Sequence, residues 1–379
     1  MIKRRFLKML TGLVLLAAVL FSGGYGYMHT AKFGAFPEGV RLQKIEASPN
    51  YRDGEFRNLE PIPTMTIEKK GVVRRLLNSL TAEKDRPRPE VPIPTVKTDL
   101  AGLDRNDDTV IWLGHSSFYM QIAGRRILID PVFSDNAAPI PFANKAFPGT
   151  NIYTTADMPD IDILLITHDH WDHLDYPTVM ALKSKIAKTI CPLGVGAHFE
   201  RWGFPESSVV EMDWNEVLQL DSGLAIHALP ARHYSGRTLT RNKTLWAAYA
   251  LISQERKIYI SGDSGYGSHF RAAGETFGGF DLAVLDSGQY NEGWRYVHMM
   301  PEDAVQATAD LQAGSLLPAH AGKFSIARHS WDDPFIRLTR TMEHSPIPLL
   351  TPKIGEPVPL DAEEHRFSQW WKENSATND

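Results

Sequence analysis

The sequence has only one cysteine, Cys191, among its 379 residues. An internal disulfide is therefore impossible, and a thiolate-rich metal site is excluded. Cys191 lies in the apolar stretch "AKTICPLGV", which favours a buried, inert thiol over a nucleophilic Cys/His site. An excess of positive charge is also missing, because the net charge at pH 7 is −5. Since no basic stripe interleaved with aromatic residues is present either, we expect no nucleic-acid partner.

Charged residues are absent from residues 9–28, "MLTGLVLLAAVLFSGGYGYM", which follow the basic segment "MIKRRFLK". The apolar core of this stretch, residues 9–21, has the length of a signal-peptide core, whereas the whole stretch reaches the roughly 20 residues that span a bilayer. No A-x-A motif follows, so an uncleaved membrane anchor is favoured over a cleaved signal. Basic residues ahead of the span place the N-terminus in the cytoplasm and the rest of the chain outside it, in the periplasm of a bacterium with two membranes. Secretion after signal cleavage is the alternative.

Composition divides the remaining chain. The proline-rich stretch "DRPRPEVPIPTV" cannot form a central strand or helix and indicates a linker. Just before it, "GVVRRLLNSL" predicts a basic amphipathic helix that packs on the neighbouring domain or lies on a lipid surface. We therefore expect four parts: an anchor or signal peptide (1–30), an accessory segment with the linker (31–105), a catalytic domain (106–355) and a polar tail (356–379).

Short apolar runs predict many strands in the catalytic domain. Residues 117–131 predict a hairpin with a turn at Ala123-Gly124, and "IDILLIT" predicts a strand covered on both faces. Helices are predicted over residues 175–188, with Asp175 as N-cap and Pro177 in the first turn, and over residues 301–313. Further strands are expected within residues 109–113, 223–229, 245–253, 257–263, 281–286 and 315–320. This alternation predicts a layered α/β fold with mixed sheets.

Residues 167–173, "THDHWDH", place three histidines and two aspartates directly after an apolar run. His168 and His170 point the same way if the segment is extended, Asp172 shares their parity, and His173 at the turn can face a second ion. Burying so many ionisable groups beside a strand costs free energy that packing alone would not offset. Imidazole and carboxylate ligands suit zinc, with manganese, iron or cobalt as alternatives.

Three further candidate ligands stand where apolar runs end. They are His233, Asp263 and His320, each followed by a polar or Gly-rich loop. Loops at the ends of neighbouring strands can converge at one edge of a sheet. Two histidine-rich half-sites bridged by Asp263 would hold two ions about 3.5–4 Å apart.

These residues, in this order, resemble the metallo-β-lactamase-fold hydrolases, and the chain is most similar to the branch that contains N-acylphosphatidylethanolamine-hydrolysing phospholipase D and its bacterial relatives. The resemblance rests on "THDHWDHLD", "WLGHSSFYMQIAGRRILIDPVFSDNAAP", "FPGTN", "PLGVGAHFERWG", "GDSGYG" and "HMMPEDAV". It covers roughly residues 57–331 and implies a four-layer αββα sandwich with its metals at one edge. One departure is "HAGKF", where many relatives have a Trp-Gly-Thr-Phe-like run.

The resemblance also implies roles for individual residues. One zinc ion would be held by His168, His170 and His233. The other would be held by Asp172, His173 and His320, and Asp263 would bridge the two.

Several residues are predicted to support the site. His298, ahead of a predicted helix, is expected as a substrate contact or proton donor. His115 either orients the site or bonds a turn, and Asp130 is expected to fix the tautomer of a ligand imidazole. His329 either borders the pocket or lies on the surface. Asp175 is interpreted as a helix cap and not as a ligand.

Together these features predict a zinc-dependent phosphoric diester hydrolase of the phospholipase D type. Our hypothesis is that a hydroxide shared by two metals attacks the phosphorus of an N-acylphosphatidylethanolamine-like membrane lipid, with Asp172, Asp263 and His298 as catalytic residues. The loop "PIPFANKAF" is either a lipid-facing lip or an ordinary packed loop. The alternatives are a hydrolase of a soluble ester, lactone or cyclic phosphate, and a non-catalytic metal-binding protein. The sequence leaves a homodimer open.

Overall fold

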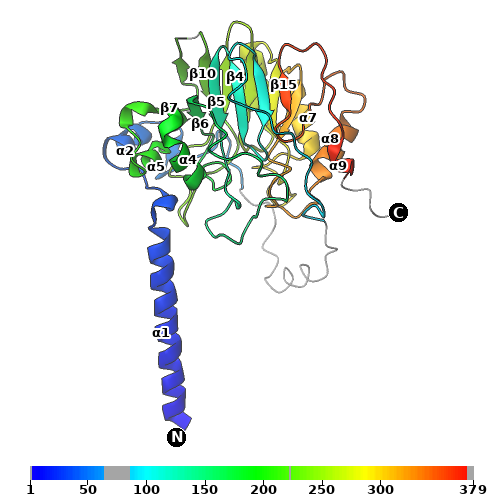
Figure 1. The fold of residues 1–379 in the computed structure, drawn as a ribbon. Helices are drawn as coiled ribbons and strands as arrows, with labels where there is room; N and C mark the ends of the chain where they lie inside the picture. Colours follow the sequence, from blue (N-terminus) through cyan, green and yellow to red (C-terminus); the bar gives the residue numbers. More distant parts are fainter. Residues whose placement is uncertain (1, 64–85, 222, 374–379) are drawn as a thin grey trace.

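The structure, a computed structural model, describes residues 2–63, 86–221 and 223–373 of the chain (Figure 1). The amphipathic helix expected over residues 71–80 lies outside the described residues.

A single long helix, α1 (Ile2–Met28), leaves the body at the N-terminus (Figure 1). From Arg4 to Met28 it is long and apolar enough to cross a membrane, and none of it is buried in the body. A signal sequence would meet the same criteria, so the helix is a candidate anchor or signal helix.

Two mixed sheets form the centre of the body. The seven-stranded sheet has the order β15-β3-β4-β5-β6-β7-β8, and the six-stranded sheet has the order β14-β13-β12-β11-β10-β9. The strands of the first sheet are β3 (Thr109–Trp112), β4 (Phe118–Ile122), β5 (Arg125–Ile129), β6 (Ile161–Leu165), β7 (Ile186–Pro192), β8 (Val209–Met212) and β15 (Pro357–Pro359). Those of the second are β9 (Val217–Gln219), β10 (Ala225–Leu229), β11 (Ala248–Ile252), β12 (Lys257–Ile260), β13 (Leu282–Asp286) and β14 (Leu316–Ala319).

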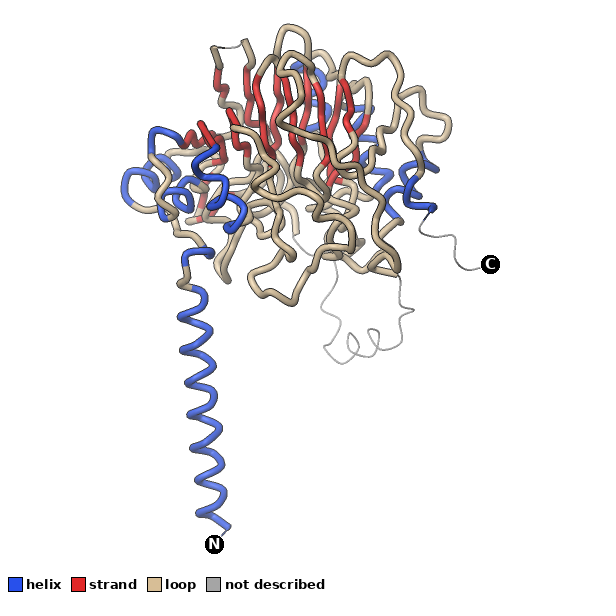
Figure 2. The backbone as a smooth tube through the Cα atoms, viewed as in Figure 1, coloured by secondary structure: helices blue, strands red, loops and turns tan. Residues whose placement is uncertain are grey.

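Each sheet contains both parallel and antiparallel strand pairs. The pairs β5–β6, β6–β7 and β7–β8 are parallel in the first sheet, as are β12–β13 and β13–β14 in the second. Parallel neighbours end at the same edge of a sheet, so the loops after β5, β6 and β7 share one edge of the first sheet, and the loops after β12, β13 and β14 share one edge of the second. Figure 2 shows these loops gathered below the strands, on the side from which α1 leaves.

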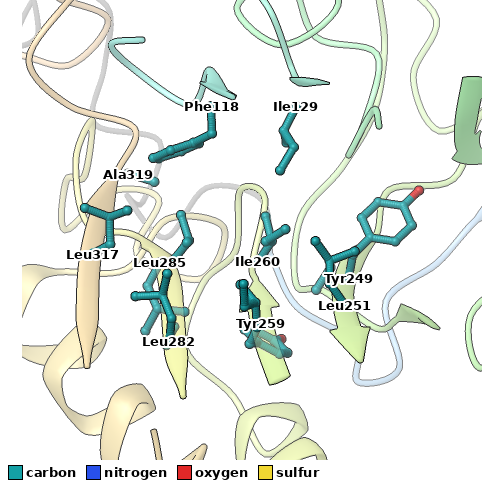
Figure 3. Packing of buried hydrophobic residues seen from close by; sticks show 14 of the residues in the cluster. Phe118, Ile129, Tyr249, Leu251, Tyr259, Ile260, Leu282, Leu285, Leu317 and Ala319 are labelled. Atoms are coloured by element: carbon teal, nitrogen blue, oxygen red, sulfur yellow. The ribbon is translucent and has the colours of Figure 1, made fainter. Parts of the chain in front are cut away.

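The core lies between the sheets because strand residues alternate between two environments. Phe118 and Met120 of β4 face the second sheet, whereas Tyr119 between them faces the opposite side. Figure 3 shows Phe118 and Ile129 approaching side chains of the second sheet, including Leu285. Burial of this apolar surface at about 25 cal/mol per Å² drives the packing of the two sheets.

Helices cover the outer faces, giving the four-layer arrangement. Side chains of α4 and α5 pack in the cluster on the outer face of the first sheet, and those of α6 and α7 pack against the second. The helices beyond α1 are α2 (Gly39–Glu46), α4 (Tyr176–Leu182), α5 (Gly196–Arg201), α6 (His269–Phe277), α7 (Pro301–Asp310), α8 (Asp333–Thr341) and α9 (Trp370–Glu373). A small hairpin, β1 (Tyr51–Arg52) and β2 (Glu55–Phe56), and three 3₁₀ turns, η1 (Ala31–Phe33), η2 (Lys183–Lys185) and η3 (Glu206–Ser208), complete the described elements.

Each of the apolar runs expected to hold a strand contains one, and the hairpin turns where predicted, with Ala123 at φ 49° and Gly124 at φ 72°. The helix expected over residues 175–188 is too long, because residues from Ile186 onward form β7, whose parallel pairing with β6 overrides their local helical pattern. Asp175 stands at the N-cap position as expected, but its carboxylate accepts hydrogen bonds from Ser134 and Thr178 side chains instead of capping backbone N–H groups.

The segment expected as a polar tail is partly packed into the body. β15 pairs with β3 at the edge of the first sheet, and the indole rings of Trp370 and Trp371 are 0% and 1% exposed. Two tryptophans bury a large apolar surface, which explains why this segment joins the core despite its charged residues.

Candidate metal centre

The segment Thr167–His173 follows β6, and all of its residues except the half-buried His170 and Trp171 are buried. His168 and His173 are 1% and 0% exposed, and Asp172 is 9% exposed. The preceding residue, Ile166, is fully buried, so the chain passes from the core into the site without reaching solvent. Ionisable groups in such surroundings are stable only if partners or a cation compensate their loss of hydration.

The three distant candidates converge on this segment from the second sheet. His233 follows β10, Asp263 follows β12 and His320 follows β14, and all three side chains are buried. All seven predicted ligands thus fall into two groups, with the ligand atoms of each group within 4.8 Å of one another. The first group contains His168, His170, His233 and Asp263, and the second contains His115, Asp172, His173 and His320.

The first group has the spacing of a tetrahedral site. Nδ1 of His170 lies 2.9 Å from Nε2 of His168 and 3.2 Å from Nε2 of His233. Oδ2 of Asp263 lies 3.7 Å and 3.6 Å from the same two Nε2 atoms. Ligand atoms about 2.0–2.1 Å from a tetrahedral zinc ion are roughly 3.3 Å apart, so these four atoms suit that geometry.

Asp263 stands between the two groups. Its Oδ2 faces His168 and His233, whereas its Oδ1 lies 3.1 Å from Nε2 of His173 and 3.0 Å from Nδ1 of His320. One carboxylate therefore presents one oxygen to each half-site. This arrangement is what a ligand shared by two cations requires.

Nε2 of His173 and Oδ1 of Asp263 face each other in the second half-site, and neither of these buried atoms has a hydrogen bond of good geometry among the described residues; the same holds for Nδ1 of His115. Nδ1 of His173 lies 2.8 Å from Oδ2 of Asp130 and donates to it, so Nε2 is the nitrogen that remains to bind a cation. The pKa of His173 is raised by the surrounding carboxylates, so a proton occupies Nε2 beside Oδ1 of Asp263, 3.1 Å away, and a metal ion would take the place of that proton. The facing atoms of His173 and Asp263 therefore support, from the structure alone, a metal ion at this set of ligands.

The imidazole orientations are fixed from behind. Asp130, at the end of β5, also accepts hydrogen bonds from Thr167 N at 2.8 Å and Thr167 Oγ1 at 2.6 Å. Nδ1 of His233 donates to the carbonyl of Val297 at 2.9 Å, which leaves its Nε2 free to ligate. Asp130 therefore lies where the sequence reasoning expects it.

The pKa values show which histidines are neutral. Burial lowers the pKa of His168, His233 and His320 well below the ordinary value, and repulsion between the neighbouring imidazoles lowers it further. Burial lowers the pKa of His170 to about 4. Neutral imidazoles are the form that binds metals.

Burial and the neighbouring charges also shift the pKa values of Asp263 and His173. Burial raises the pKa of Asp263 to about 6. Burial alone would lower the pKa of His173, but Asp263, Asp172 and Asp130 outweigh it and raise that pKa. An excess of negative charge therefore surrounds His173, and a bound cation would balance it in place of a proton.

His115 supports the second half-site from the end of β3. Its Nε2 lies 3.0 Å from Oδ2 of Asp172 and fixes that carboxylate. His115, Asp130 and His320 have positive φ angles of 55°, 41° and 65°, a conformation that costs non-glycine residues of order 1–3 kcal/mol. Such strain concentrates at functional sites, where surrounding contacts hold it in place.

His298 lies at the mouth of the site, and the sequence reasoning missed its partner. Nδ1 of His298 lies 2.9 Å from Oδ2 of Asp286, the last residue of β13. Asp286 is fully buried, and burial raises its pKa well above the usual range. An aspartate ending the apolar run "DLAVLD" repeats the pattern that singles out Asp263 and His320, and could have been found by it.

The site opens into a pocket of about 520 Å³. His170, Asp172, Asp263, His298 and His320 line it. Sequence reasoning also missed Trp171, Tyr234, Leu239 and Arg241 in its wall. These residues carry no metal-binding pattern, so nothing in the sequence marks them.

Three other residues, His329, Lys323 and Cys191, are not part of the pocket wall. His329 stacks on Tyr290, with ring centroids 4.2 Å apart, and is absent from the described pocket lining. Lys323, in the departing run "HAGKF", is buried and donates from Nζ to the carbonyl of Val132 at 2.8 Å. Burial lowers its pKa to about 7. Cys191 is buried in β7, away from the site.

The chain is similar to one family model and to several known proteins. Residues 125–321 match the family model described as a beta-lactamase superfamily domain. An uncharacterised protein of Mycobacterium tuberculosis is 38% identical over 373 residues, covering 97% of this chain and 99% of the relative. N-acyl-phosphatidylethanolamine-hydrolyzing phospholipase D 1 of Caenorhabditis elegans is 28% identical over 307 residues, covering 77% of this chain and 84% of the relative. A metallo hydrolase from Ignicoccus hospitalis has a similar fold, with a TM-score of 0.52 and 21% identity over 67% of this chain and 98% of that one.

Proposed function

The chain belongs to the metallo-β-lactamase-fold hydrolases, and from that premise we propose that it is a binuclear zinc phosphodiesterase of the phospholipase D type. Its substrate would be an N-acylphosphatidylethanolamine-like membrane lipid. The observation that carries the proposal is the placement of Asp263, with one carboxylate oxygen toward each histidine-rich half-site. The relative from Caenorhabditis elegans, named for hydrolysis of this lipid class, supports the choice of substrate.

The ligand assignment follows the two groups. His168, His170 and His233 would hold one ion, Asp172, His173 and His320 the other, and Asp263 both. Nitrogen and oxygen donors without sulfur suit zinc and also manganese, iron or cobalt. Two such ions would supply a nucleophile from water at neutral pH and stabilise negative charge on the phosphoryl oxygens.

His298 is the residue that we expect to protonate the leaving group. Its Nδ1 is held by Asp286 at 2.9 Å, which fixes the ring and leaves Nε2 for the pocket. A proton at Nε2 can pass to the headgroup alcohol as its bond to phosphorus breaks. Asp286 acts on the substrate only through His298 and is a positioning residue.

The pocket wall offers contacts for a phosphate and for apolar chains. The guanidinium of Arg241, 4.8 Å from the centroid of Tyr234, places a positive charge at the mouth. Leu239 in the pocket lining is 88% exposed, and Phe142, in the loop that contributes Pro139 and Asn144 to the lining, is 74% exposed. An exposed apolar rim around a charged pocket fits an amphipathic substrate better than a small soluble one.

The location proposed for the site is the outer surface of the membrane that holds α1. The helix is apolar over the length of a span, and basic residues precede that span. The loop "PIPFANKAF" would then face lipid, as its exposed Phe142 indicates.

The experiment is a parallel assay of the full-length protein in detergent, with its metal content measured. The substrates are N-acylphosphatidylethanolamine, phosphatidylcholine, an acyl-homoserine lactone and bis-p-nitrophenyl phosphate. We expect two metal ions per chain and hydrolysis of the first and last. Turnover of the lactone alone would favour the soluble-substrate alternative, and two bound metals without any turnover would favour a non-catalytic metal-binding protein.

The variants Asp263→Ala and His168→Ala test the metal centre. Outer partners of metal ligands contribute about 10–100-fold to metal affinity or activity, so loss of a ligand should cost at least about a hundredfold in hydrolysis. His227→Ala is the matched control, because His227 lies on β10, which leads to His233, but packs its ring on Phe277. Full activity of Asp263→Ala without bound metal would refute the proposal.

A further inference from the structure

The end of α1 is part of the wall of the catalytic pocket. Tyr27 and Met28, its last two residues, line the same 520 Å³ pocket as His170 and Asp172. Phe33, five residues after the helix ends, also lines it and is 7% exposed. The segment that joins the helix to the body is therefore a built part of the site.

This joining segment, residues 27–35, is bonded to the loop "PIPFANKAF" on one side. Oη of Tyr27 and Nζ of Lys32 both donate to the carbonyl oxygen of Pro139, the latter at 2.6 Å. Lys32 also donates to Oη of Tyr27. Three groups thus meet at one point and fix the loop to the end of α1.

On its inner side the joining segment is bonded to the metal-binding segment through Arg237. The guanidinium of Arg237 donates from Nη2 to the carbonyl of Lys32 at 2.8 Å. From Nη1 it donates to the carbonyls of Asp169 at 2.9 Å and Leu174 at 2.7 Å, which bracket the ligands His170, Asp172 and His173. Arg237 is 3% exposed, so these bonds are shielded from water.

Aromatic packing follows the same route. The ring of Phe33 meets the ring of Trp171 edge to face, with centroids 4.9 Å apart. Trp171 stands between two candidate ligands in the sequence, and the guanidinium of Arg237 lies 4.1 Å from its centroid. Edge-to-face and cation–π contacts of this kind stabilise the packing of Phe33 and Arg237 on Trp171.

The outer side of the joining segment is also closely fitted. Trp202 and Arg201 donate to the carbonyls of Ala31 at 2.7 Å and His29 at 2.8 Å. Ala35 N donates to Nδ1 of His198 at 3.1 Å. Gly34, at φ 73°, is required there because a Cβ atom would lie 1.9 Å from that same nitrogen.

Because it is bonded on three sides, the joining segment holds α1 in a fixed orientation relative to the body. A simple tether would be a solvated chain without such contacts, free to let the body rotate over the surface. The direction in which α1 leaves the body is instead determined by the same groups that hold the metal-binding segment. Figure 1 shows the helix leaving on the side where the loops gather below the strands.

The height of the pocket above the membrane follows from the helix geometry. Twenty uncharged residues, 9–28, rise about 30 Å at 1.5 Å per residue, which is the thickness of the hydrocarbon core. With α1 as an anchor, Tyr27 and Met28 would lie where the hydrocarbon meets the headgroups, a level that tyrosine favours. A pocket lined by these residues would then open at the depth of lipid phosphates.

Resting on the proposed function, we propose that the enzyme takes its substrate from the same membrane that holds α1, and that residues 27–35 orient the pocket toward that membrane. The exposed apolar residues Leu239 and Ile326 in the pocket lining would then contact its lipids. The partner of this face is the bilayer of the anchor itself.

The test reconstitutes full-length protein in vesicles of phosphatidylethanolamine and phosphatidylglycerol. N-acylphosphatidylethanolamine is placed either in the same vesicles or in a second, protein-free population, and bis-p-nitrophenyl phosphate reports on the metal centre. We expect lipid in the same vesicles to be cleaved at least tenfold faster. Equal rates in the two arrangements would overturn the inference and leave the proposed function standing.

A linker variant separates orientation from mere tethering. Twelve Gly/Ser residues inserted between Gly26 and Tyr27 leave residues 27–35 intact but let the body move by about 20 Å. We expect unchanged hydrolysis of bis-p-nitrophenyl phosphate and a fivefold or greater loss in cleavage of lipid in the same vesicles. The same twelve residues added ahead of Met1 are the matched control and should change neither rate.

Two other outcomes would also contradict the inference. Cleavage of lipid at the wild-type rate by the linker variant would show that the segment is a tether, which contradicts the inference. Turnover of bis-p-nitrophenyl phosphate without cleavage of lipid in either arrangement would refute the proposed function, and the inference with it.

Discussion

Replacement of Asp130 by asparagine should weaken metal binding without removing any predicted ligand. Asp130 accepts hydrogen bonds from Thr167 N at 2.8 Å, Thr167 Oγ1 at 2.6 Å and His173 Nδ1 at 2.8 Å. Asparagine has nearly the same shape but only one acceptor oxygen. In Asp130→Asn the amide NH₂ must therefore face at least one of these donors.

The consequence falls on the tautomer of His173. Thr167 N is a backbone donor that cannot turn away, so the amide oxygen should stay with it and the NH₂ group should face His173. Nδ1 of His173 then becomes an acceptor, and its proton moves to Nε2, the atom that faces Asp263 at 3.1 Å. A protonated Nε2 cannot ligate a metal.

We expect a 10–100-fold loss of affinity for one of the two metal ions, which corresponds to about 1.4–2.8 kcal/mol. The assay is a chelator competition that follows both ions, combined with hydrolysis of bis-p-nitrophenyl phosphate. Asp162→Asn is the matched control, because Asp162 also accepts two N–H groups, from Arg126 at 2.8 Å and Arg105 at 2.9 Å, but lies at the far end of β6. Two ions bound by Asp130→Asn as tightly as by the wild type would show that His173 is not oriented in this way.

Three further predictions follow from other parts of the site. His298→Ala should keep both metals but lose about 10²–10⁴-fold in turnover of a lipid with a poor leaving group, and much less with p-nitrophenolate; equal losses on both substrates would exclude a proton donor. Since burial lowers the pKa of Lys323 to about 7, the unfolded chain binds more protons between about pH 7 and 10, so the free energy of unfolding should rise with pH there. Urea unfolding of the metal-free protein at pH 7 and 9 should show this rise, and Lys323→Met should lack it; the same rise in both proteins would contradict the assignment. Gly34→Ala should release the joining segment and expose Lys32 to trypsin, because the added Cβ cannot fit beside His198, whereas unchanged proteolysis would show that the segment adapts.

Local patterns were enough to predict most strands and to select the candidate ligands that the structure brings together. Alternation and apolar runs are properties of a few consecutive residues, and each predicted ligand stands at the end of such a run or in the segment 167–173. Convergence of His233, Asp263 and His320 follows because β10, β12 and β14 run in the same direction and end at one edge of their sheet. The resemblance supplied how these residues would divide between two ions; the six histidine and aspartate ligands other than Asp263 fall into the same two groups in the structure, and His115 joins the second.

Long-range packing could not be predicted in this way. Residues from Ile186 have a helical pattern and become a strand only because β6 lies beside them. Trp370 and Trp371 look like part of a polar tail until the core into which they pack is known. The joining segment escaped notice because its bonds reach residues more than a hundred positions away, such as Pro139, His198 and Arg237.

The most direct measurement is anomalous X-ray diffraction from crystals of the metal-loaded protein, at the absorption edge of the bound metal. Two peaks about 3.5–4 Å apart, one on each side of the Asp263 carboxylate, are expected. A single peak, or two peaks that share no contact with Asp263, would contradict a binuclear centre and the hydrolysis proposed from it.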